Sequence, residues 1–367
     1  MIKQLVIDGI VGTRPNMMKM APFARAVEAD GRFKLRLIHT GQHYDEKMSD
    51  IFFSELGLPP PAFNLKVGAG PHGEQTARIL SGYESILMHE PRPHGVVVVG
   101  DVTSTMACTL AAVKLGLPVA HIEAGLRSGD RSMPEEINRI VTDALADLLF
   151  VSDPDGLWHL AHEGRPREQT WLVGNIMMDT LYNELKAAEQ STILQTLRLQ
   201  AGAYAFMTLH RPSNVDTPQH LQQIVSTIQE LSYDLPVVFA VHPRTRERIS
   251  SLKSTTLGTE KFRLIEPLGY RENLCMMKNA RMVISDSGGI QEETTVLNVP
   301  CLTLRENTER PITVELGSSE LVGNDPAKIR EAWYRALNGK WKITSSIPLW
   351  DGRTAERIVS QLGKQWL

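Results

Sequence analysis

Short apolar segments alternate with longer amphipathic segments along almost the whole chain, and this alternation constrains the fold more than any other feature. Apolar runs such as residues 5–11, 95–101 and 236–243 have the length of single strands. Several are apolar at nearly every position, as strands are when helices cover both faces of a parallel sheet. The segments 103–116 and 221–232 have the length and pattern of helices. The sequence therefore predicts an α/β fold with parallel sheets.

The predicted strands fall into two series. They cover residues 5–11, 35–40, 95–101, 118–123, 148–152, 170–175, 205–210, 236–243, 262–267, 282–286 and 301–306. A helical and then polar stretch separates the sixth strand from the seventh. We therefore expect two doubly wound, Rossmann-like domains of similar size with an interdomain cleft, residues 1–172 and 173–348. Residues 349–367 are predicted to be a C-terminal helix that could pack back on the first domain.

The composition is that of an ordinary soluble globular protein. Of 367 residues, 42% are hydrophobic and 22% are charged, and the formal charge of −3 does not favour nucleic acid or an acidic membrane as a partner. Cys108, Cys275 and Cys301 are widely spaced and predict buried thiols rather than a zinc site or disulfides. The sequence shows neither a signal peptide nor a membrane-spanning run, so we expect a cytoplasmic protein.

Basic residues follow the first predicted strand, in the segment GTRPNMMKMAP at residues 12–22. Ligands of doubly wound sheets bind beyond the carboxyl ends of the strands, so Arg14 and Lys19 could bring two cations toward a phosphate. Gly12 would allow a tight turn before them. The spacing fits neither the dinucleotide-binding pattern nor the P-loop. The alternative is a strand-to-helix turn with two solvated cations.

Three carboxylates are candidates for proton transfer. Asp101 ends a predicted strand, where it could cap the next helix or lie at a catalytic site. Glu123 also ends a strand, and a buried carboxylate there needs a partner or a raised pKa. For Glu135, Ser132-x-x-Glu135 fits a capping box, and the residues alone favour that structural role.

Histidines with nearby basic residues follow two predicted strands in the second half of the chain. His210 and Arg211 follow one strand, and His242 and Arg244 follow the next. A histidine at a strand end can be a core residue or an acid–base group. Two such clusters in one domain favour a site that handles phosphate.

The segment SDSGGIQEETT, residues 285–295, marks a change from strand to helix. Ser287, Gly288 and Gly289 lie at this change. Glycine lets the backbone approach a ligand, and the first N–H groups of a helix can bind phosphate. Arg310 lies further on, in the post-strand segment RENTERP.

Together these segments resemble one family, the non-hydrolysing UDP-N-acetylglucosamine 2-epimerases, from about residue 3 to about residue 323. The matching blocks, in order, are GTRPNMMKMAP, TGQHYD, GDVTST, HIEAGLRSGDRSMPEEINR, VGN, TLHRPSNVD, HPR, DSGGIQEE and TERP. The resemblance implies the two-domain architecture of the B-type glycosyltransferases, a UDP-sugar substrate and a homodimer. It implies no NAD and no obligatory metal.

The resemblance also implies a reaction. A base removes the C2 proton of UDP-N-acetylglucosamine while UDP leaves C1, which gives 2-acetamidoglucal. UDP then adds back, and C2 is reprotonated on the opposite face to give UDP-N-acetylmannosamine. Asp101, Glu123 and Glu135 match the catalytic carboxylates of the family, and His210 matches its functional histidine. We expect Asp101 and Glu123 to transfer the protons, Glu135 to be an alternative base or electrostatic partner, and His210 to support the leaving diphosphate.

The remaining expected site residues bind the substrate. They are Arg14, Lys19, Arg127, His242, Arg244, Ser287, Gly288, Gly289, Glu293 and Arg310. By resemblance Glu293 accepts hydrogen bonds from the ribose, whereas Glu292, about 100° away around the helix, should matter much less. The sequence departs from the family at Asn16, where an acid is usual.

Four other functions fit the same residues less well. They are a hydrolysing relative, a 2-epimerase of another UDP-2-acetamido sugar, a glycosyltransferase of the same architecture and a catalytically silent nucleotide-sugar binder.

Overall fold

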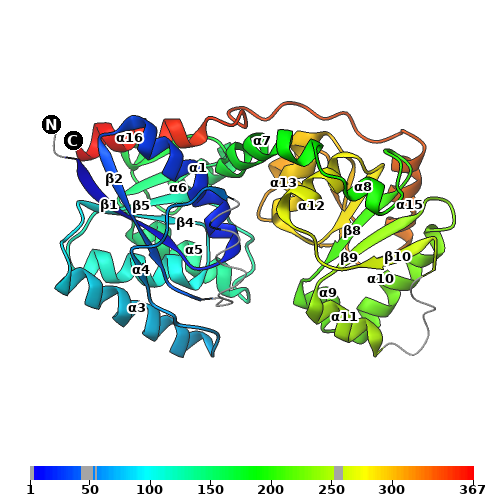
Figure 1. The fold of residues 1–367 in the computed structure, drawn as a ribbon, viewed down its shortest axis with the longest axis horizontal. Coiled ribbons are helices and arrows are strands. Elements are labelled where there is room, and N and C mark those ends of the chain that lie inside the picture. Colours follow the sequence, from blue (N-terminus) through cyan, green and yellow to red (C-terminus); the bar gives the residue numbers. More distant parts are fainter. Residues whose placement is uncertain (1–3, 43–52, 54–55, 252–258) are drawn as a thin grey trace. The chain divides into compact units, whose positions relative to one another are not determined.

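The computed structural model describes residues 4–42, 53, 56–251 and 259–367, apart from the side chains of Pro243 and Arg244 (Figure 1). The chain forms two compact units. The first combines Met1–Thr180 with Pro348–Leu367, and the second is Leu181–Ile347. Each unit contains one parallel sheet flanked by helices.

The first unit has a seven-stranded sheet in the order β3-β2-β1-β4-β5-β6-β7. Its strands are β1 (Leu5–Val11), β2 (Phe33–His39), β3 (Phe63–Asn64), β4 (Gly95–Val99), β5 (Val119–Ala124), β6 (Leu148–Val151) and β7 (Thr170–Leu172). Every pair of neighbouring strands is parallel. The strand order reverses between β1 and β4, and such a switch point is where doubly wound sheets bind ligands.

The second unit repeats this topology with six strands, in the order β10-β9-β8-β11-β12-β13. The strands are β8 (Ala205–Leu209), β9 (Val237–Val241), β10 (Phe262–Ile265), β11 (Met282–Ser285), β12 (Cys301–Thr303) and β13 (Ser319–Leu321). All pairs are again parallel. The switch point lies between β8 and β11. The predicted pair of doubly wound, Rossmann-like sheets is thus confirmed.

Helices connect the strands in both units. The first unit contains α1 (Arg14–Asp30), α3 (His72–His89), α4 (Thr103–Lys114), α5 (Pro134–Leu145), α6 (Pro154–His162), the 3₁₀ turn η1 (Arg167–Gln169) and α16 (Thr354–Trp366). The second unit contains α8 (Ile193–Thr196), α9 (Pro212–Val215), α10 (Pro218–Leu231), α11 (Pro243–Ser250), α12 (Tyr270–Lys278), α13 (Gly288–Leu297), α14 (Ile312–Glu315) and α15 (Pro326–Leu337). Helix α7 (Ile176–Glu189) begins in the first unit and ends in the second.

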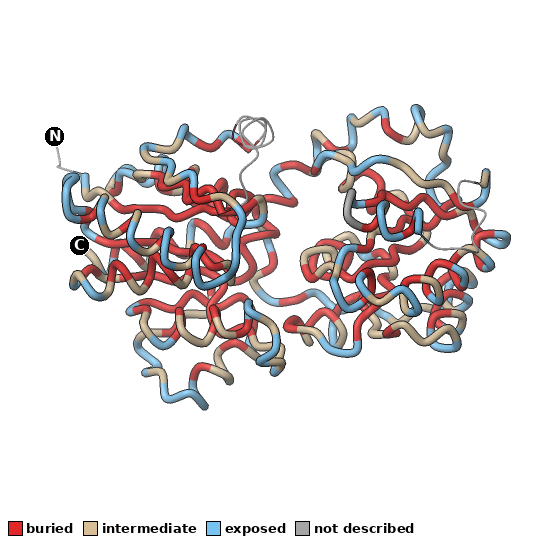
Figure 2. Tube along the Cα trace, turned by 90° about the horizontal axis from the view of Figure 1, so that it is seen from below, coloured by how far each residue is buried: buried red, intermediate tan, exposed pale blue. Residues whose placement is uncertain are grey.

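The central strands are buried on both faces, which explains their continuous apolar sequences (Figure 2). All five residues of β4 and of β9 are buried. Burying a Val, Ile or Phe side chain stabilises the fold by roughly 1.5–3 kcal/mol. The three cysteines are free and buried, as predicted. Each sheet therefore forms the centre of its own hydrophobic core.

One buried acid interrupts the apolar pattern of β1. Asp8 lies opposite Arg36 in the register of β1 and β2, and its carboxylate pairs with that guanidinium at 2.6 Å. The hydroxyl of Tyr83 in α3 donates to the same carboxylate at 2.9 Å. Burial nevertheless raises the pKa of Asp8 above its ordinary value. This cluster anchors α3 to the sheet.

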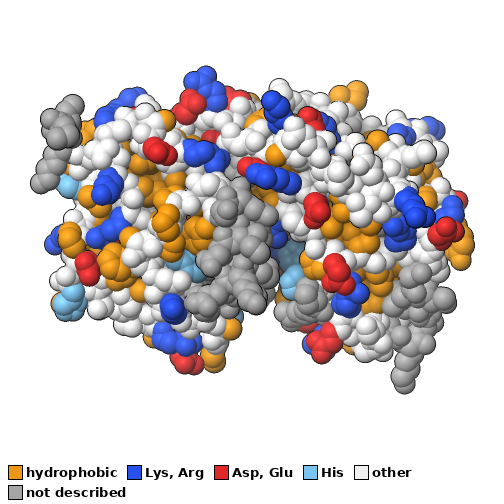
Figure 3. Space-filling model, viewed as in Figure 1, with side chains coloured by type: hydrophobic (Ala, Val, Ile, Leu, Met, Phe, Trp, Pro, Cys, Tyr) orange, Lys and Arg blue, Asp and Glu red, His pale blue; other side chains and the backbone are white. Residues whose placement is uncertain are grey.

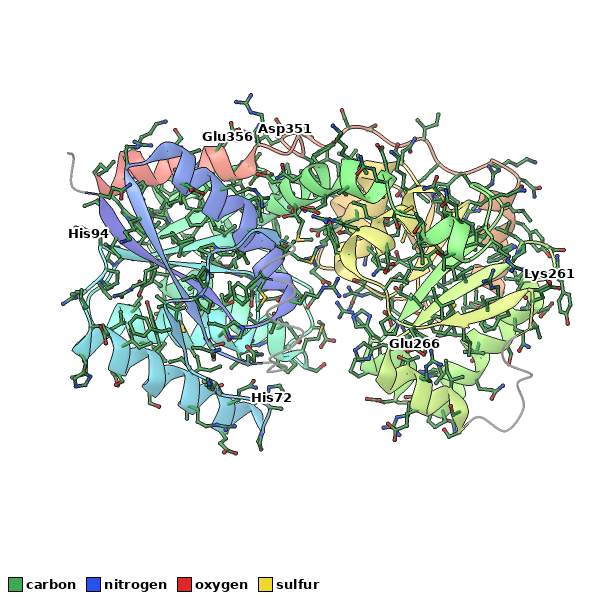
Figure 4. The ribbon with its side chains drawn as sticks, in the orientation of Figure 1. His72, His94, Lys261, Glu266, Asp351 and Glu356 are labelled. Carbon is green, nitrogen blue, oxygen red and sulfur yellow. The ribbon has the colours of Figure 1, made fainter. Side chains whose placement is uncertain are left out.

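The C-terminal segment belongs to the first unit, where α16 packs against α1. Asp179 of α7 caps α16, since its carboxylate accepts hydrogen bonds from the backbone N–H groups of Thr354 and Ala355 at 3.0 and 2.8 Å. Figure 4 labels Asp351 and Glu356 where this segment enters α16. The division between the units therefore falls at residues 180/181 and 347/348, whereas the sequence had suggested 172/173 and 348/349.

Acidic and basic side chains are interspersed over the face shown in Figure 3. Of the helices in the described part of the chain, none combines the length and the apolar character needed to cross a lipid bilayer.

Candidate active site

The loop after β1 is held by Asn16, which stands where the family that the sequence resembles usually has an acid. Its Oδ1 accepts hydrogen bonds from the backbone N–H groups of Gly12 and Thr13, both at 3.2 Å. Its Nδ2 donates to the carbonyl oxygen of Val99 at 2.9 Å and so ties this loop to the end of β4. A carboxylate could accept the first two bonds but could not donate the third. Asn16 therefore has a structural role that an acid cannot fill in the ionised form.

Gly12 is needed because the chain is crowded there. A Cβ at this position would come within 2.1 Å of Ser104 Oγ and 2.7 Å of Thr40 Oγ1. These two hydroxyls bond each other at 2.7 Å, and Ser104 also donates to Gln42. The loops after β1 and β2 thereby contact the start of α4.

Lys19 and Glu123 form a buried ion pair between α1 and the end of β5. Glu123 has a φ of 74°, in the left-handed region that a non-glycine residue rarely adopts. It lies where the register of β5 and β6 shifts, between Ile122 and Ala124. Such local strain costs about 1–3 kcal/mol and is found disproportionately at functional sites. The backbone distortion and the ion pair together fix the direction of the Glu123 carboxylate.

Asp101, after β4, is paired with Arg139 of α5 at 2.5 Å. Arg139 also pairs with Glu136 at 2.7 Å, and Asn138 donates to the carbonyl oxygen of Asp101 at 2.9 Å. The N-cap of α4 is Val102, so the helix-capping role considered for Asp101 is not found. Asp101 is instead held by two residues of α5, Arg139 and Asn138.

Glu135 is exposed at the first turn of α5, and the capping box predicted for it is wrong. The N-cap is Met133, because Pro134 occupies the first helical position, and no side chain caps the helix. The hydroxyl of Ser132 donates to Asp130 at 2.6 Å instead. Glu136 is the buried acid of this helix. Burial would raise the pKa of Glu136, but the N–H groups of Ser128 and Gly129 and the charge of Arg139 lower it.

A buried network of hydrogen bonds and ion pairs connects the loops that follow β4 and β5, on either side of Glu123 in the sequence. His121 Nδ1 lies 2.6 Å from Asp143 Oδ1, and its Nε2 lies 2.8 Å from the carbonyl oxygen of Gly100. The other oxygen of Asp143 accepts from the N–H of Gly125 at 3.0 Å and pairs with Arg127 at 2.8 Å. Arg127, an expected substrate ligand, is thus engaged by Asp143 and, at 2.7 Å, by Glu163.

In the second unit, Asp286 follows β11 and organises the loop after β8. Its buried carboxylate accepts from the backbone N–H of Arg211 at 2.9 Å and from Asn214 Nδ2 at 3.1 Å, and it lies 3.0 Å from His210 Nδ1. Burial would raise the pKa of Asp286, but His210, Arg211 and Asn214 lower it. The imidazole of His210, 48% exposed, is therefore oriented by a buried carboxylate.

The start of α13 lies against a cluster of buried ion pairs. Arg310 pairs with Glu292 at 2.6 Å and with Glu309 at 2.6 Å. A Cβ on Gly288 would come within 2.8 Å of the Arg310 guanidinium and 2.9 Å of Glu309, so a larger residue would have to displace the ends of these two side chains. Glu292, which the sequence predicts to matter much less than Glu293, is itself buried and paired with Arg310.

Glu309 is the common acceptor of three arginines. It pairs with Arg305 and Arg310, each at 2.6 Å, and with Arg211 at 3.3 Å. Burial would raise the pKa of Glu309, but the three positive charges lower it well below its ordinary value. This residue links the segment 305–311 to the loop after β8.

The other expected ligands of the second unit lie at strand ends or in the helix that follows. Ser287 is the N-cap of α13, and its N–H donates to Ser285 Oγ at 3.1 Å. Around Gly289 the described atoms leave open space, and Glu293 is buried one turn further along. His242, the N-cap of α11, is exposed. The side chain of Arg244 lies outside the described residues, as do His43, Tyr44 and Asp45 of the TGQHYD block.

Within the described ranges, no three His, Cys, Asp or Glu side chains are grouped so that they could hold a metal ion.

The sequence model of UDP-N-acetylglucosamine 2-epimerases matches residues 25–363. The chain belongs to the UDP-N-acetylglucosamine 2-epimerase family. A Methanocaldococcus jannaschii member of this name is 43% identical over 359 residues, which cover 95% of this chain and 96% of the relative. A Pseudomonas aeruginosa relative named UDP-2,3-diacetamido-2,3-dideoxy-D-glucuronate 2-epimerase is 38% identical over 358 residues, 97% of this chain and 98% of the relative.

Solved structures agree with this family assignment. The crystal structure of M. jannaschii UDP-GlcNAc 2-epimerase in complex with UDP-GlcNAc and UDP has a TM-score of 0.88 and 42% identity, and covers 98% of this chain and 100% of that one. A structure of Phytolacca americana UGT2 complexed with UDP-2fluoro-glucose and pterostilbene has a TM-score of 0.57 at 13% identity, covering 99% of both chains. This second likeness concerns the fold alone and agrees with the predicted B-type glycosyltransferase architecture.

Proposed function

We propose that this protein interconverts UDP-N-acetylglucosamine and UDP-N-acetylmannosamine without net hydrolysis. The observation that carries the proposal is the similarity, over nearly the full length of both chains, to a relative named UDP-N-acetylglucosamine 2-epimerase. The geometry supports it, since each unit places polar groups at the switch point of its sheet.

The proposed reaction has two balanced halves. In the first, a base accepts the C2 proton, the C–H electrons form a C1=C2 double bond, and the C1–O bond breaks with its electrons on UDP. In the second, the same UDP oxygen attacks C1 and an acid delivers a proton to C2 on the opposite face. The net reaction consumes no water and transfers no electrons to another molecule.

We assign the two proton transfers to Asp101 and Glu123, with Glu135 as an alternative base or electrostatic partner. Inversion at C2 needs proton transfer on two faces, so more than one acid–base group is required. Asp101 follows β4 and Glu123 lies at the end of the neighbouring strand β5, and each is paired with a cation of the protein. The strained backbone of Glu123 supports a functional role for this residue.

We assign binding of UDP to the second unit. His210, held by Asp286, supports the leaving diphosphate, while Ser287, Gly288 and Gly289 approach it at the start of α13. Glu293 accepts hydrogen bonds from the ribose hydroxyls.

The remaining basic residues divide into two groups. Arg14, His242 and Arg244 are kept as proposed substrate ligands. Lys19, Arg127 and Arg310 are ion-paired with carboxylates of the protein, so we now propose that they hold the site in shape rather than act chiefly as phosphate ligands.

The decisive experiment incubates the protein with UDP-N-acetylglucosamine in deuterated water and follows the sugar by NMR. The proposal expects deuterium at C2 and the appearance of the manno epimer. Recovery of unexchanged substrate from a folded protein would exclude this activity. Steady accumulation of free UDP would indicate the hydrolysing alternative, and transfer of the sugar to an added acceptor would indicate a glycosyltransferase.

The name of the P. aeruginosa relative suggests an alternative substrate for this protein, a UDP-2,3-diacetamido uronate. The M. jannaschii and P. aeruginosa relatives are almost equally similar to this chain, at 43% and 38% identity. The same exchange experiment with both UDP-sugars, compared as kcat/KM, decides between them. We expect the higher value for UDP-N-acetylglucosamine.

The homodimer and the cytoplasmic location expected from the sequence are part of this proposal. Size-exclusion chromatography with light scattering tests the first, and fractionation of cells tests the second.

A further inference from the structure

The buried pair His121–Asp143 is not used by the proposed chemistry, yet it contacts the loops that carry both proposed proton-transfer residues. Both side chains are completely buried. Burying an unpaired carboxylate or imidazolium is costly, so a buried charged pair is retained only where every polar atom has a partner. Here every one has. The arrangement therefore calls for an explanation beyond filling the core.

Both ring nitrogens of His121 face oxygen atoms. Nδ1 lies 2.6 Å from the Asp143 carboxylate and Nε2 lies 2.8 Å from the carbonyl oxygen of Gly100. The carbonyl oxygen of Gly100 can only accept, so the ring donates to it through Nε2, while Nδ1 and the Asp143 carboxyl share the second hydrogen bond. Asp143 contacts both His121 and Arg127, and Arg127 also pairs with Glu163. The four side chains thus form one continuous network.

The backbone N–H and the backbone carbonyl of Gly100 both form hydrogen bonds with residues of β5. Its N–H donates to the carbonyl oxygen of Ile122 at 3.0 Å, and its carbonyl oxygen accepts from His121. Asp101 is the next residue along the chain, and Glu123 follows Ile122 directly. The distance between the backbones that carry the two carboxylates is therefore set through these two bonds.

The other end of the network fixes the loop after Glu123. Asp143 accepts from the N–H of Gly125 at 3.0 Å, two residues beyond the strained backbone of Glu123. A single carboxylate in α5 thus restrains both loops, one through His121 and one directly.

We infer that His121 and Asp143 are a positioning pair, which holds the Asp101 and Glu123 loops at the spacing that proton transfer at C2 requires. This inference rests on the proposed function. Neither residue is assigned a contact with substrate, so their removal should affect turnover rather than substrate binding. A misplacement of about 1 Å in such a site can lower the rate on the order of a hundredfold.

Two substitutions of His121 separate positioning from general stability. The amide nitrogen of Asn approximates Nδ1 and that of Gln approximates Nε2, so His121→Asn keeps the bond to Asp143 and His121→Gln keeps the bond to Gly100. Each variant loses one of the two hydrogen bonds that the imidazole makes. His39→Asn is the control, since His39 is a buried histidine of the same sheet that contacts Asn64 and Phe53.

We expect His121→Asn to lower kcat at least tenfold with KM within about twofold of the wild type. His121→Gln should retain most of kcat, and His39→Asn should leave it unchanged even if the melting temperature falls. Equal losses of kcat in the two His121 variants, or losses that follow the melting temperature in all three, would overturn the inference. If His121→Asn does not fold, His121→Thr replaces it with the same expectation, because it also removes the donor to the carbonyl oxygen of Gly100.

Crystal structures of the two His121 variants test the inference independently of any activity. The turn at Gly100–Asp101 should be displaced in His121→Asn and unchanged in His121→Gln, and an unmoved turn in both would refute the inference. If the wild type acts on no UDP-sugar, the proposed function fails, while these structures still decide whether His121 positions the turn.

Discussion

Lys19 and Glu123 form a buried ion pair although 104 positions separate them in the sequence. The pair joins helix α1 to the strained end of β5. It fixes the direction of a carboxylate that we assign to proton transfer, and it accounts for a lysine that the sequence had suggested as a phosphate ligand.

The pair should be energetically coupled. Removing one partner of a buried pair leaves an uncompensated charge and typically costs about 3–5 kcal/mol, whereas removing both costs less. We expect Lys19→Met to destabilise the protein, and Lys19→Met combined with Glu123→Gln to destabilise it by less than the sum of the single changes. Urea unfolding of the four proteins gives the coupling. Strictly additive losses would contradict a coupled pair.

Removing either assigned carboxylate should abolish most of the turnover. Glu123→Gln and Asp101→Asn should each lower the rate of C2 exchange by at least about a hundredfold, because a positioned acid–base group contributes about 10²–10⁴-fold. Proton exchange followed by NMR measures this. Glu28→Gln, at an exposed carboxylate of α1, is the control and should not alter the rate. A normal rate in either variant removes that residue from the mechanism.

Glu292 and Glu293 should both affect UDP binding, but for different reasons. Glu293→Gln should weaken binding about tenfold by removing a charged acceptor of ribose hydroxyls. Glu292→Gln should weaken binding and also lower the melting temperature, because it removes the partner of buried Arg310. Calorimetric titration with UDP and thermal unfolding separate the two effects. An unaffected melting temperature in Glu292→Gln would argue against the buried pair.

Glu309 should make stability depend on acid pH. Its folded-state pKa is well below the ordinary value, because three arginines outweigh the effect of burial. Ionised Glu309 therefore stabilises the fold fully above the unfolded-state pKa of about 4.3, and this contribution is lost as the pH falls through the lower folded-state value. The difference in unfolding free energy between the wild type and Glu309→Gln should be constant above about pH 5 and shrink below about pH 4. Glu315→Gln, at an exposed carboxylate, should show no such trend.

Asn16→Asp, which restores the acid usual in the family, should destabilise this protein. It removes the amide donor that bonds the carbonyl oxygen of Val99. A carboxylate oxygen then faces that carbonyl oxygen, and both atoms are acceptors. The loss of a buried hydrogen bond of this kind costs about 1–3 kcal/mol. Urea unfolding tests this, with the exposed Asn183→Asp as the matched control. Equal stability of the two variants would show that the bond to Val99 contributes nothing.

The sheets could be predicted because their central strands are apolar over their whole length. All eleven predicted strands are present. The two that were missed, β3 and β13, are the edge strands Phe63–Asn64 and Ser319–Leu321. Strands of two and three residues with polar members carry no apolar run, and they form only because a neighbouring strand offers its backbone groups.

Partners of the site residues could not be predicted in the same way. Arg139 and Asp286 hold Asp101 and His210, yet each lies far along the chain from its partner. An acid directly after β11 was the available signal for Asp286, because strand ends of a parallel sheet meet at one edge. The capping box at Glu135 failed for a local reason, since Pro134 set the start of α5.

The return of the chain to its first unit has a consequence for biosynthesis. Helix α16 packs on α1 and is capped by Asp179, but it is translated only after the whole of Leu181–Ile347. On the ribosome the second unit can therefore be complete while the apolar face that awaits α16 is still uncovered. Domains usually finish folding in the order of their synthesis. In this chain the unit that begins first is the one that is finished last.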